Sequence, residues 1–173
     1  NGVQETSNEY HTSKITDLAI NWITTQSNPW FAWVAYSAPH APFHLPPQDL
    51  HSRDDLTGSD DHIAANQRAY YLAAIEAMDT EINRLLASME IATRENTIII
   101  YLGDNGTPRP VIDNATYENT HAKGTLYQGG IAVPLVISGK GVTRMGEREI
   151  ALVTATDLYA TIGQLAGITN SQV

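Results

Sequence analysis

Side chains that could bind a metal ion follow an apolar run near the middle of the chain. Residues 97–102 read Thr-Ile-Ile-Ile-Tyr-Leu, and Gly103, Asp104, Asn105 and Gly106 follow directly. Ligands of open α/β sheets bind beyond strand ends, and a carboxylate beside an amide carbonyl offers the hard oxygen donors that suit Ca²⁺ or Mg²⁺. The same residues also form ordinary turns. The pattern alone therefore leaves a metal site and a simple turn both open.

Two histidines lie in a proline-rich loop after another apolar run. His40 and His44 are four positions apart, the spacing at which a helix presents two imidazoles to one zinc ion. Pro39 and Pro42 flank and interrupt the pair, so no helix spans it and this zinc motif is excluded. A loop histidine such as His40 can still donate a proton to a leaving group near neutral pH. The alternative is a histidine that is solvent-exposed or hydrogen-bonded for structural reasons.

A lysine begins a glycine-rich segment later in the chain. Residues 123–130 read Lys-Gly-Thr-Leu-Tyr-Gln-Gly-Gly. Lys123 precedes its glycines, so the segment is not a nucleotide-binding P-loop. Its ammonium group could balance the charge of a tetrahedral oxyanion. A loop lysine in water is the other interpretation.

The elements that must position these residues follow from apolar periodicity. Apolar residues at helical spacing predict helices over residues 13–26 and 62–89, and a capped helix from Thr156 or Asp157 to near Gly167. Near-continuous apolar runs predict buried strands, namely residues 30–36, 97–102 and 133–138, with a short fourth strand over 150–153. We therefore expect an α/β fold with a mostly parallel sheet flanked by helices.

Charge and composition exclude several classes of function. The 173 residues carry 10 Lys and Arg against 19 Asp and Glu, a formal charge of −9, so no positive field attracts nucleic acid or an anionic membrane. The chain has no cysteine, which excludes disulfides, thiolate zinc sites and a cysteine nucleophile. No apolar run approaches the roughly 18 residues of a membrane span. We expect neither a nucleic-acid nor a membrane partner.

Four segments, in this order, resemble the sulfatase family of the alkaline-phosphatase superfamily. They are the run with its Ala-Pro-His-Ala-Pro loop (30–42), the run ending in Asp-Asn-Gly (98–106), the lysine segment (123–130), and Asp-Leu-Tyr with Leu-Ala-Gly (157–159 and 165–167). The resemblance covers about residues 12–168. It implies that residues 1–173 form an incomplete sulfatase-like catalytic domain, which lacks the N-terminal part with the nucleophile and the C-terminal subdomain.

The resemblance also implies a role for each candidate residue. Asp104 and Asn105 would be ligands of a divalent cation, usually Ca²⁺, with Mg²⁺ as the alternative. Lys123 would contact the sulfate group and balance its charge, and His40 would contact a sulfate oxygen or the leaving oxygen as a general acid. Both would therefore be catalytic and substrate-binding residues in the hydrolysis of a sulfate ester.

The chain departs from the family pattern at several positions. The nucleophile of sulfatases is a formylglycine made within Cys/Ser-x-Pro-x-Arg, and this motif is absent here. Gln128 stands where the family has Glu, and Ala132 stands in place of Arg. We therefore expect the formylglycine upstream, the missing remainder of the polypeptide as a partner, no turnover by this chain alone, and a periplasmic or secreted location. A phosphonate or phosphate ester hydrolase of the same superfamily, or an inactive binding module, are the alternatives.

Overall fold

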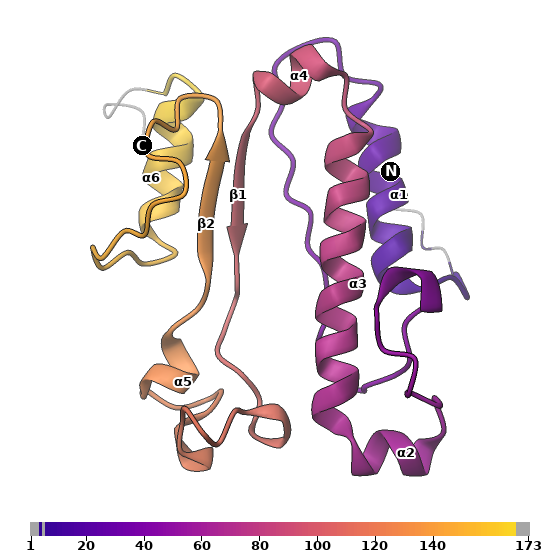
Figure 1. Cartoon of the computed structure of the whole chain (residues 1–173). Helices are drawn as coiled ribbons and strands as arrows, with labels where there is room; N and C mark the ends of the chain where they lie inside the picture. The colour runs from indigo at the N-terminus through magenta and orange to yellow at the C-terminus, as the bar shows by residue number, and fades with distance from the viewer. Residues whose placement is uncertain (1–3, 5, 169–173) are drawn as a thin grey trace. The chain divides into compact units, whose positions relative to one another are not determined.

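The computed structural model describes residue 4 and residues 6–168 of the chain. It divides into two compact units, Asn1–Gly141 and Val142–Val173, and each is described by itself (Figure 1). The first unit contains all four candidate residues: His40, Asp104, Asn105 and Lys123. The described residues of the second unit, 142–168, contain one helix.

The first unit has a helical part in which two helices lie side by side, α1 (His11–Ile23) and α3 (Gln67–Ala87) (Figure 1). A short helix, α2 (Asp60–Ala65), precedes α3. The side chains along one face of α3 are buried, and they include Tyr70, Ala73, Ala77, Met78 and Leu85. The small alanines allow close packing, and removal of this apolar surface from water stabilises the unit.

A polar cluster joins α1 to α3 inside this apolar contact. The carboxylate of Glu81 is almost fully buried, and it accepts hydrogen bonds from Ser13 Oγ at 2.7 Å and Arg84 Nε at 2.8 Å. Arg84 also pairs with Asp17 at 2.7 Å. Partial burial lowers the pKa of Arg84, but its bonds to these two carboxylates outweigh burial and raise it. A buried carboxylate with this many partners fixes how the two helices are aligned.

The predicted helices are confirmed with changed ends. The single helix expected over 62–89 is broken at Asn66, whose backbone is non-helical. Ser59 caps α2, because its side chain accepts a hydrogen bond from His62 N at 3.4 Å. Asp60 and Asp61 then occupy the first turn, where negative charge favours a helix start. The periodicity did not reveal this break, because the apolar stripe that predicts the helix begins at Tyr71, after Asn66.

The sheet of the first unit has two strands among the described residues, β1 (Ile98–Leu102) and β2 (Leu135–Gly139). They pair antiparallel, with Ile100 opposite Ile137. Both strands lie within a residue or two of their predicted positions. The expected mostly parallel sheet is not confirmed by this pairing, and the side chains of β1 are half-buried rather than fully buried.

Residues 30–36 were predicted to form a buried strand, and this prediction is wrong. The segment is not part of the sheet, and its backbone makes no hydrogen bond within the described part of the chain. Alternate side chains face solvent, with Phe31 and Trp33 exposed by 60% and 77%. Inward-facing Tyr36 hydrogen-bonds Thr16 of α1 at 2.9 Å. An apolar run thus indicated an extended backbone correctly, but one of its faces is uncovered.

The second unit contains α6 (Asp157–Leu165), which begins and ends close to its predicted bounds. Asp157 Oδ2 accepts a hydrogen bond from Thr154 N at 2.7 Å and so closes the turn before the helix. The prediction of a short strand over residues 150–153 is wrong. The segment is a loop in which Ile150 and Leu152 are almost completely exposed, so no packing favours a strand.

The remaining elements are short helices in the connections: η1 (Gln48–Leu50), α4 (Ile91–Glu95), η2 (Arg109–Val111), η3 (Asn119–His121) and α5 (Gln128–Ile131). Among the helices of the described ranges, none combines the length and the apolar character needed to cross a bilayer.

Candidate functional site

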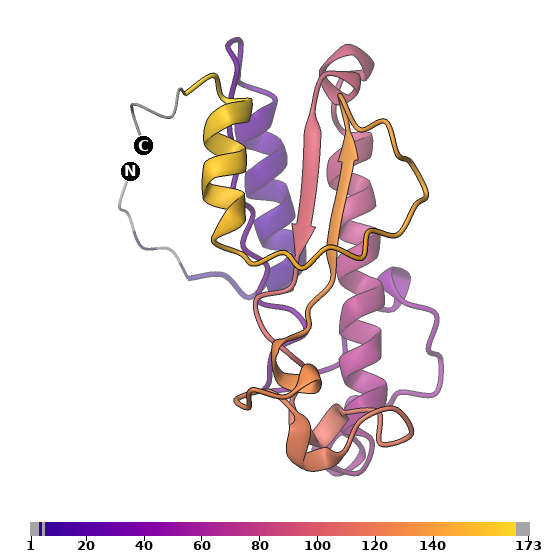
Figure 2. The same cartoon turned by 90° about the vertical axis from the view of Figure 1, so that its left-hand side faces the viewer.

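The loop after β1 and the lysine segment are joined by backbone hydrogen bonds. Gly106 N donates to Gly130 O at 3.0 Å, and Lys123 N donates to Thr107 O at 2.8 Å. Figure 2 shows the chain between β1 and β2 folded below the two strands, so both loops lie at one end of the ribbon. Residues 16 and 24 positions apart in the sequence are therefore held in one small region of the first unit.

Glycines allow these two loops to approach so closely. A Cβ atom placed on Gly106 would collide with the backbone oxygen of Gly129 and would lie 2.7 Å from the backbone carbons of Gly130. A Cβ on Gly130 would meet Ala122 O at 2.8 Å. Contacts between carbon and backbone atoms at such distances are strongly repulsive. Gly106 and Gly130 thus allow the lysine segment to approach the loop that follows β1.

Asp104 and Asn105 present oxygen atoms at the end of β1. Both residues are exposed, and no hydrogen bond or ion pair engages the Asp104 carboxylate within residues 6–168. The amide of Asn105 donates from Nδ2 to Gly106 O at 3.0 Å, which leaves its Oδ1 available. These are two hard donors of the kind that Ca²⁺ and Mg²⁺ prefer.

The donor set fits part of a divalent-cation site. Ca²⁺ takes about six to eight oxygen ligands and Mg²⁺ takes six. The described part of the chain has no cluster of three or more His, Cys, Asp or Glu side chains that could hold a metal ion. Asp104 and Asn105 therefore match two of the required ligands in type, and the others must come from water, substrate or further protein groups.

Lys123 is half-buried and has no acidic partner among the described residues. Most of the chain's other basic side chains are paired, as Arg84 is with Asp17 and Glu81, or Arg53 is with Glu76 at 2.9 Å. An ammonium group without a carboxylate neighbour can attract an external anion, because no internal charge neutralises it.

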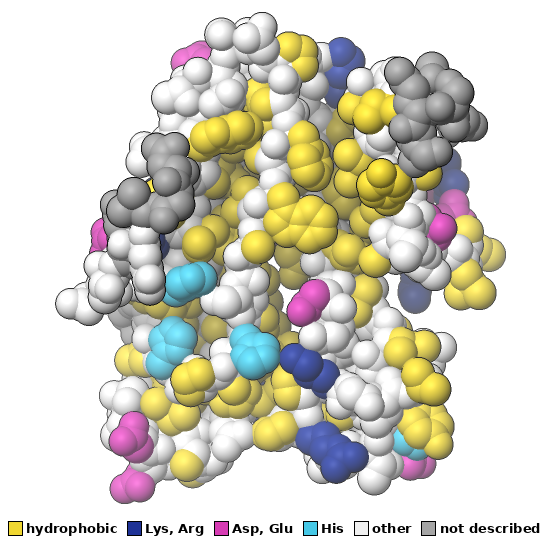
Figure 3. Space-filling view, turned by 180° about the vertical axis from the view of Figure 1, so that it is seen from behind, with side chains coloured by type: hydrophobic (Ala, Val, Ile, Leu, Met, Phe, Trp, Pro, Cys, Tyr) yellow, Lys and Arg dark blue, Asp and Glu magenta, His cyan; other side chains and the backbone are white. Residues whose placement is uncertain are grey.

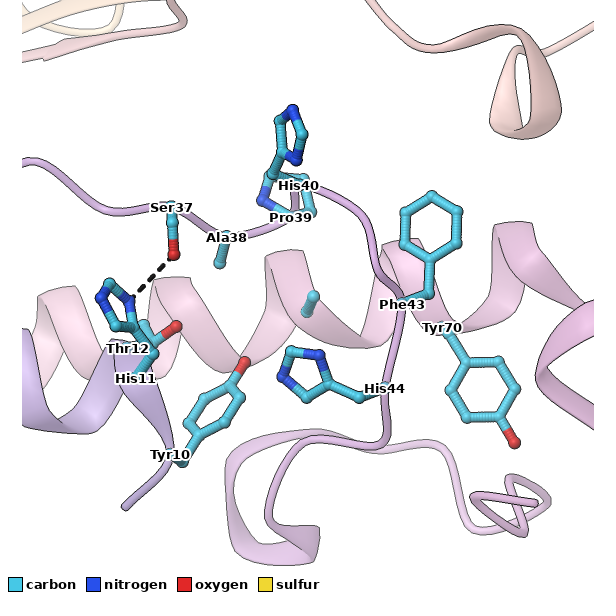
Figure 4. Close-up of a pocket in the computed structure, with 11 residues that line it drawn as sticks. Tyr10, His11, Thr12, Ser37, Ala38, Pro39, His40, Phe43, His44 and Tyr70 are labelled. Carbon is cyan, nitrogen blue, oxygen red and sulfur yellow. Dashed lines mark hydrogen bonds between the residues drawn. The ribbon is translucent and has the colours of Figure 1, made fainter. Parts of the chain in front are cut away.

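His40 lies in the loop that follows residues 30–36. Its Nδ1 hydrogen-bonds Ala41 O at 2.7 Å, so this nitrogen carries the proton in the neutral ring and Nε2 is left free. Figure 4 shows the imidazole pointing to the opposite side of the loop from Tyr10 and His44. The free Nε2 can accept a hydrogen bond when the ring is neutral and donate one when the ring is protonated.

The chain direction brings these loops toward one end of the first unit. Figure 1 shows residues 30–36 and β1 running the same way, so the loops with His40 and Asp104 follow their segments toward the same end. Figure 3 shows histidine, acidic and basic side chains close together on one face. Within the described ranges, no hydrogen bond, ion pair or ring contact joins His40 to Asp104, Asn105 or Lys123.

Sequence patterns missed a pocket beneath the histidine loop. Tyr10, His11, Ser37 and His44 line a cavity of about 30 Å³ together with His40 (Figure 4). Tyr10 and His11 come from the start of α1, 26 or more positions from their partners in the loop. The one sequence signal was their place directly before the predicted helix.

A second missed feature lies in the lysine segment. The rings of His121 and Tyr127 stack with centroids 3.5 Å apart and an angle of 18° between their planes. His121 and Tyr127 flank Lys123 in the sequence. Their stacking restricts the loop that carries the ammonium group.

Comparison with known proteins extends these local observations to nearly the whole chain. The sulfatase family model matches residues 1–168. An uncharacterized sulfatase of Escherichia coli, YdeN, is 31% identical over 166 residues, which are 92% of this chain and 28% of that protein. A sulfatase of Formosa agariphila is 29% identical, over 90% of this chain and 30% of its own length. Mouse arylsulfatase J is 28% identical, over 96% and 26% respectively.

The chain spans less than a third of the length of these relatives. The family carries the alkaline-phosphatase-like α/β fold, with which the alternation of helices and strands in the first unit agrees. The family model covers far more than half of the 173 residues. The chain therefore belongs to the sulfatase family.

Proposed function

We propose that residues 1–173 are the later part of a catalytic domain that hydrolyses sulfate esters, and that they supply His40, Asp104, Asn105 and Lys123 to its active site. One observation carries the proposal. The loop with Asp104 and Asn105 is hydrogen-bonded along its backbone to the segment with Lys123. Two oxygen donors and an unpaired ammonium group are thereby held together in a chain of the sulfatase family.

Each residue has a role that suits its surroundings. Lys123 binds the sulfate group and balances its negative charge, since no acidic side chain competes for it in the described residues. His40 binds a sulfate oxygen or the leaving oxygen through Nε2, because Nδ1 is already engaged by Ala41 O. In its protonated form it donates a proton to the leaving alcohol oxygen as the S–O bond breaks.

Asp104 and Asn105 hold a divalent cation, for which Ca²⁺ is the first choice and Mg²⁺ the second. The free carboxylate of Asp104 and the free Oδ1 of Asn105 support this role. The bound cation supplies positive charge that stabilises the negative oxygens of the transferring group.

The nucleophile lies outside this chain in our proposal. The sequence has no cysteine and no Cys/Ser-x-Pro-x-Arg motif, so the formylglycine would come from another part of a longer polypeptide. The sulfatases of Escherichia coli and Formosa agariphila are more than three times as long as the matched region. The uncovered backbone of residues 30–36 is a second reason to expect that further polypeptide packs here. The remainder of the polypeptide and a sulfate ester are thus the proposed partners, and a periplasmic or secreted location rests on the family resemblance alone.

Hydrolysis of p-nitrophenyl sulfate by a full-length enzyme that contains residues 1–173 tests the proposal. Removal of one such charged contact typically costs about 3 kcal/mol in the barrier, so Asp104→Ala and Lys123→Ala should each lower kcat/KM by roughly 100-fold or more. Lys14→Ala is the control, because Lys14 pairs with Glu9 on the surface of α1. Added Ca²⁺ should restore activity lost to a chelator.

Three results would contradict the proposal. Equal activity of the Lys123→Ala and Lys14→Ala variants would leave Lys123 as an ordinary loop lysine. Hydrolysis of p-nitrophenyl phosphate or a phosphonate ester with no sulfate activity would favour the phosphoryl alternative. Activity on none of these esters, in an enzyme with the complete nucleophile motif, would favour an inactive binding module.

A further inference from the structure

We propose that His11 and Tyr10 are positioning residues that hold the loop of residues 37–44 at both ends and so fix His40 between them. The catalytic significance of this positioning rests on the proposed function, whereas the contacts themselves do not depend on it. Consecutive side chains at the start of α1 contact the two ends of one loop, and His40 lies in the middle of that loop (Figure 4).

The first contact holds the beginning of the loop. Ser37 Oγ is hydrogen-bonded to His11 Nδ1 at 2.9 Å, and Figure 4 shows this bond as a dashed line. The carbonyl oxygen of Ser37 accepts a hydrogen bond from the backbone N–H of His40 at 2.9 Å. Ser37 is therefore held by His11 through its side chain, and it holds His40 through its backbone.

The second contact holds the end of the loop. The ring of Tyr10 meets the ring of His44 edge to face, with centroids 5.6 Å apart. His44 Nδ1 hydrogen-bonds Pro42 O at 3.1 Å, which fixes the orientation of that ring in its own loop. Aromatic pairs of this geometry are favourable beyond the area that they bury.

The start of α1, which makes both contacts, is itself well packed. Thr12 and Thr16, in the first two turns of α1, are buried to 98% or more, and Ser13 bonds to buried Glu81 of α3 at 2.7 Å. The loop is thus fixed to a helix start whose neighbouring side chains are buried. A side chain that must meet a reacting group tolerates little displacement, because a shift of about 1 Å can cost about 100-fold in rate.

Amide hydrogen exchange of the 173-residue chain, measured by NMR, tests this inference without any need for activity. The variants are His11→Ala, Ser37→Ala and the double variant. Loss of one hydrogen bond, about 1 kcal/mol, should speed exchange of the His40 amide about fivefold in each single variant. Because both substitutions remove the same hydrogen bond, the His40 amide should exchange no faster in the double variant than in either single variant.

Two further variants show whether the effect is specific. His11→Asn keeps a polar atom near the position of Nδ1 and should restore at least half of the lost protection. His51→Ala is the matched control, since His51 accepts a hydrogen bond from Arg53 N at 3.2 Å and lies outside the pocket. It should leave exchange of the His40 amide unchanged.

Unchanged exchange at His40 in His11→Ala, an equal change in His51→Ala, or additive effects in the double variant would each overturn the inference. In the full-length enzyme, His11→Ala should lower kcat about 10- to 100-fold while KM changes less than threefold. Wild-type kcat in His11→Ala, together with loss of activity in His40→Ala, would refute positioning and leave the proposed function intact. Full activity in His40→Ala, with the exchange coupling present, would refute the function of His40 and leave its positioning intact.

Discussion

Replacement of Gly106 by alanine should separate the two loops of the candidate site. The new Cβ would collide with the backbone oxygen of Gly129 and would lie 2.7 Å from two backbone carbons of Gly130. None of these atoms belongs to a flexible side chain. The clash can therefore be relieved only by moving one loop away from the other.

The expected loss of stability follows from two parts. Insertion of a methyl group into a tightly packed place typically costs about 1–3 kcal/mol, and the displaced backbone also loses the Gly106 N–H bond to Gly130 O, worth about 1 kcal/mol. We expect Gly106→Ala to lower the free energy of unfolding by about 2–4 kcal/mol. That is a large share of the 5–15 kcal/mol typical of a domain.

Urea denaturation followed by circular dichroism measures this difference. Gly163→Ala is the matched control, because a Cβ at Gly163 meets nothing within 4 Å and alanine favours the helix α6. This control should unfold at an equal or slightly higher urea concentration. A Gly106→Ala protein as stable as the Gly163→Ala protein would refute the close approach of the two loops.

Two further predictions concern the helical part. In urea denaturation, Glu81→Ala should lower the free energy of unfolding by about 2–3 kcal/mol, which is less than for a fully buried ion pair because Arg84 is 43% exposed and keeps Asp17 as a partner. The control Glu95→Ala, at an exposed position, should change the stability little. Equal effects of the two substitutions would contradict the role of the polar cluster. A hydrogen bond from the backbone N–H of Ser52, with further bonds from the Ser52 hydroxyl and Arg53, holds the pKa of Glu76 below its ordinary value of 4.5. The stabilisation is therefore complete above pH 4.5 and is lost as pH falls through the lower folded-state pKa, so the difference in Tm between wild type and Glu76→Gln should shrink from pH 6 to pH 3. A difference that is the same at both pH values would contradict this assignment.

Local patterns predicted the elements whose own residues decide their structure. The helical spacing of Ile15, Leu18 and Trp22 identified α1, and the run of isoleucines identified β1. Asp60 and Asp61, whose negative charge favours a helix start, occupy the first turn of α2.

The failures have a common physical cause. An apolar run indicates that residues 30–36 are extended, but pairing depends on a neighbouring strand that no local pattern describes. The direction of the β1 pairing likewise depends on β2, more than 30 residues away.

The candidate site shows the same division between local patterns and long-range contacts. Motif order made Lys123 and Asp104 candidates, whereas the backbone bonds between their loops became visible only in the structure. The contact between His11 and Ser37 joins residues 26 positions apart, and neither residue type is unusual at its position. Side chains that position a functional residue from a distance leave no local signal in a single sequence.

The central claim is that Asp104, Asn105, Lys123 and His40 converge on one site. Titration of the ¹⁵N-labelled chain with Mn²⁺, a paramagnetic ion that binds oxygen ligands, tests this claim most directly. We predict that the amide signals of Asp104 and Asn105 broaden first and that those of Lys123 and His40 broaden next, while the signal of Thr25, just beyond the end of α1, stays sharp. Broadening that begins elsewhere, or that spares both Lys123 and His40, would contradict the claim.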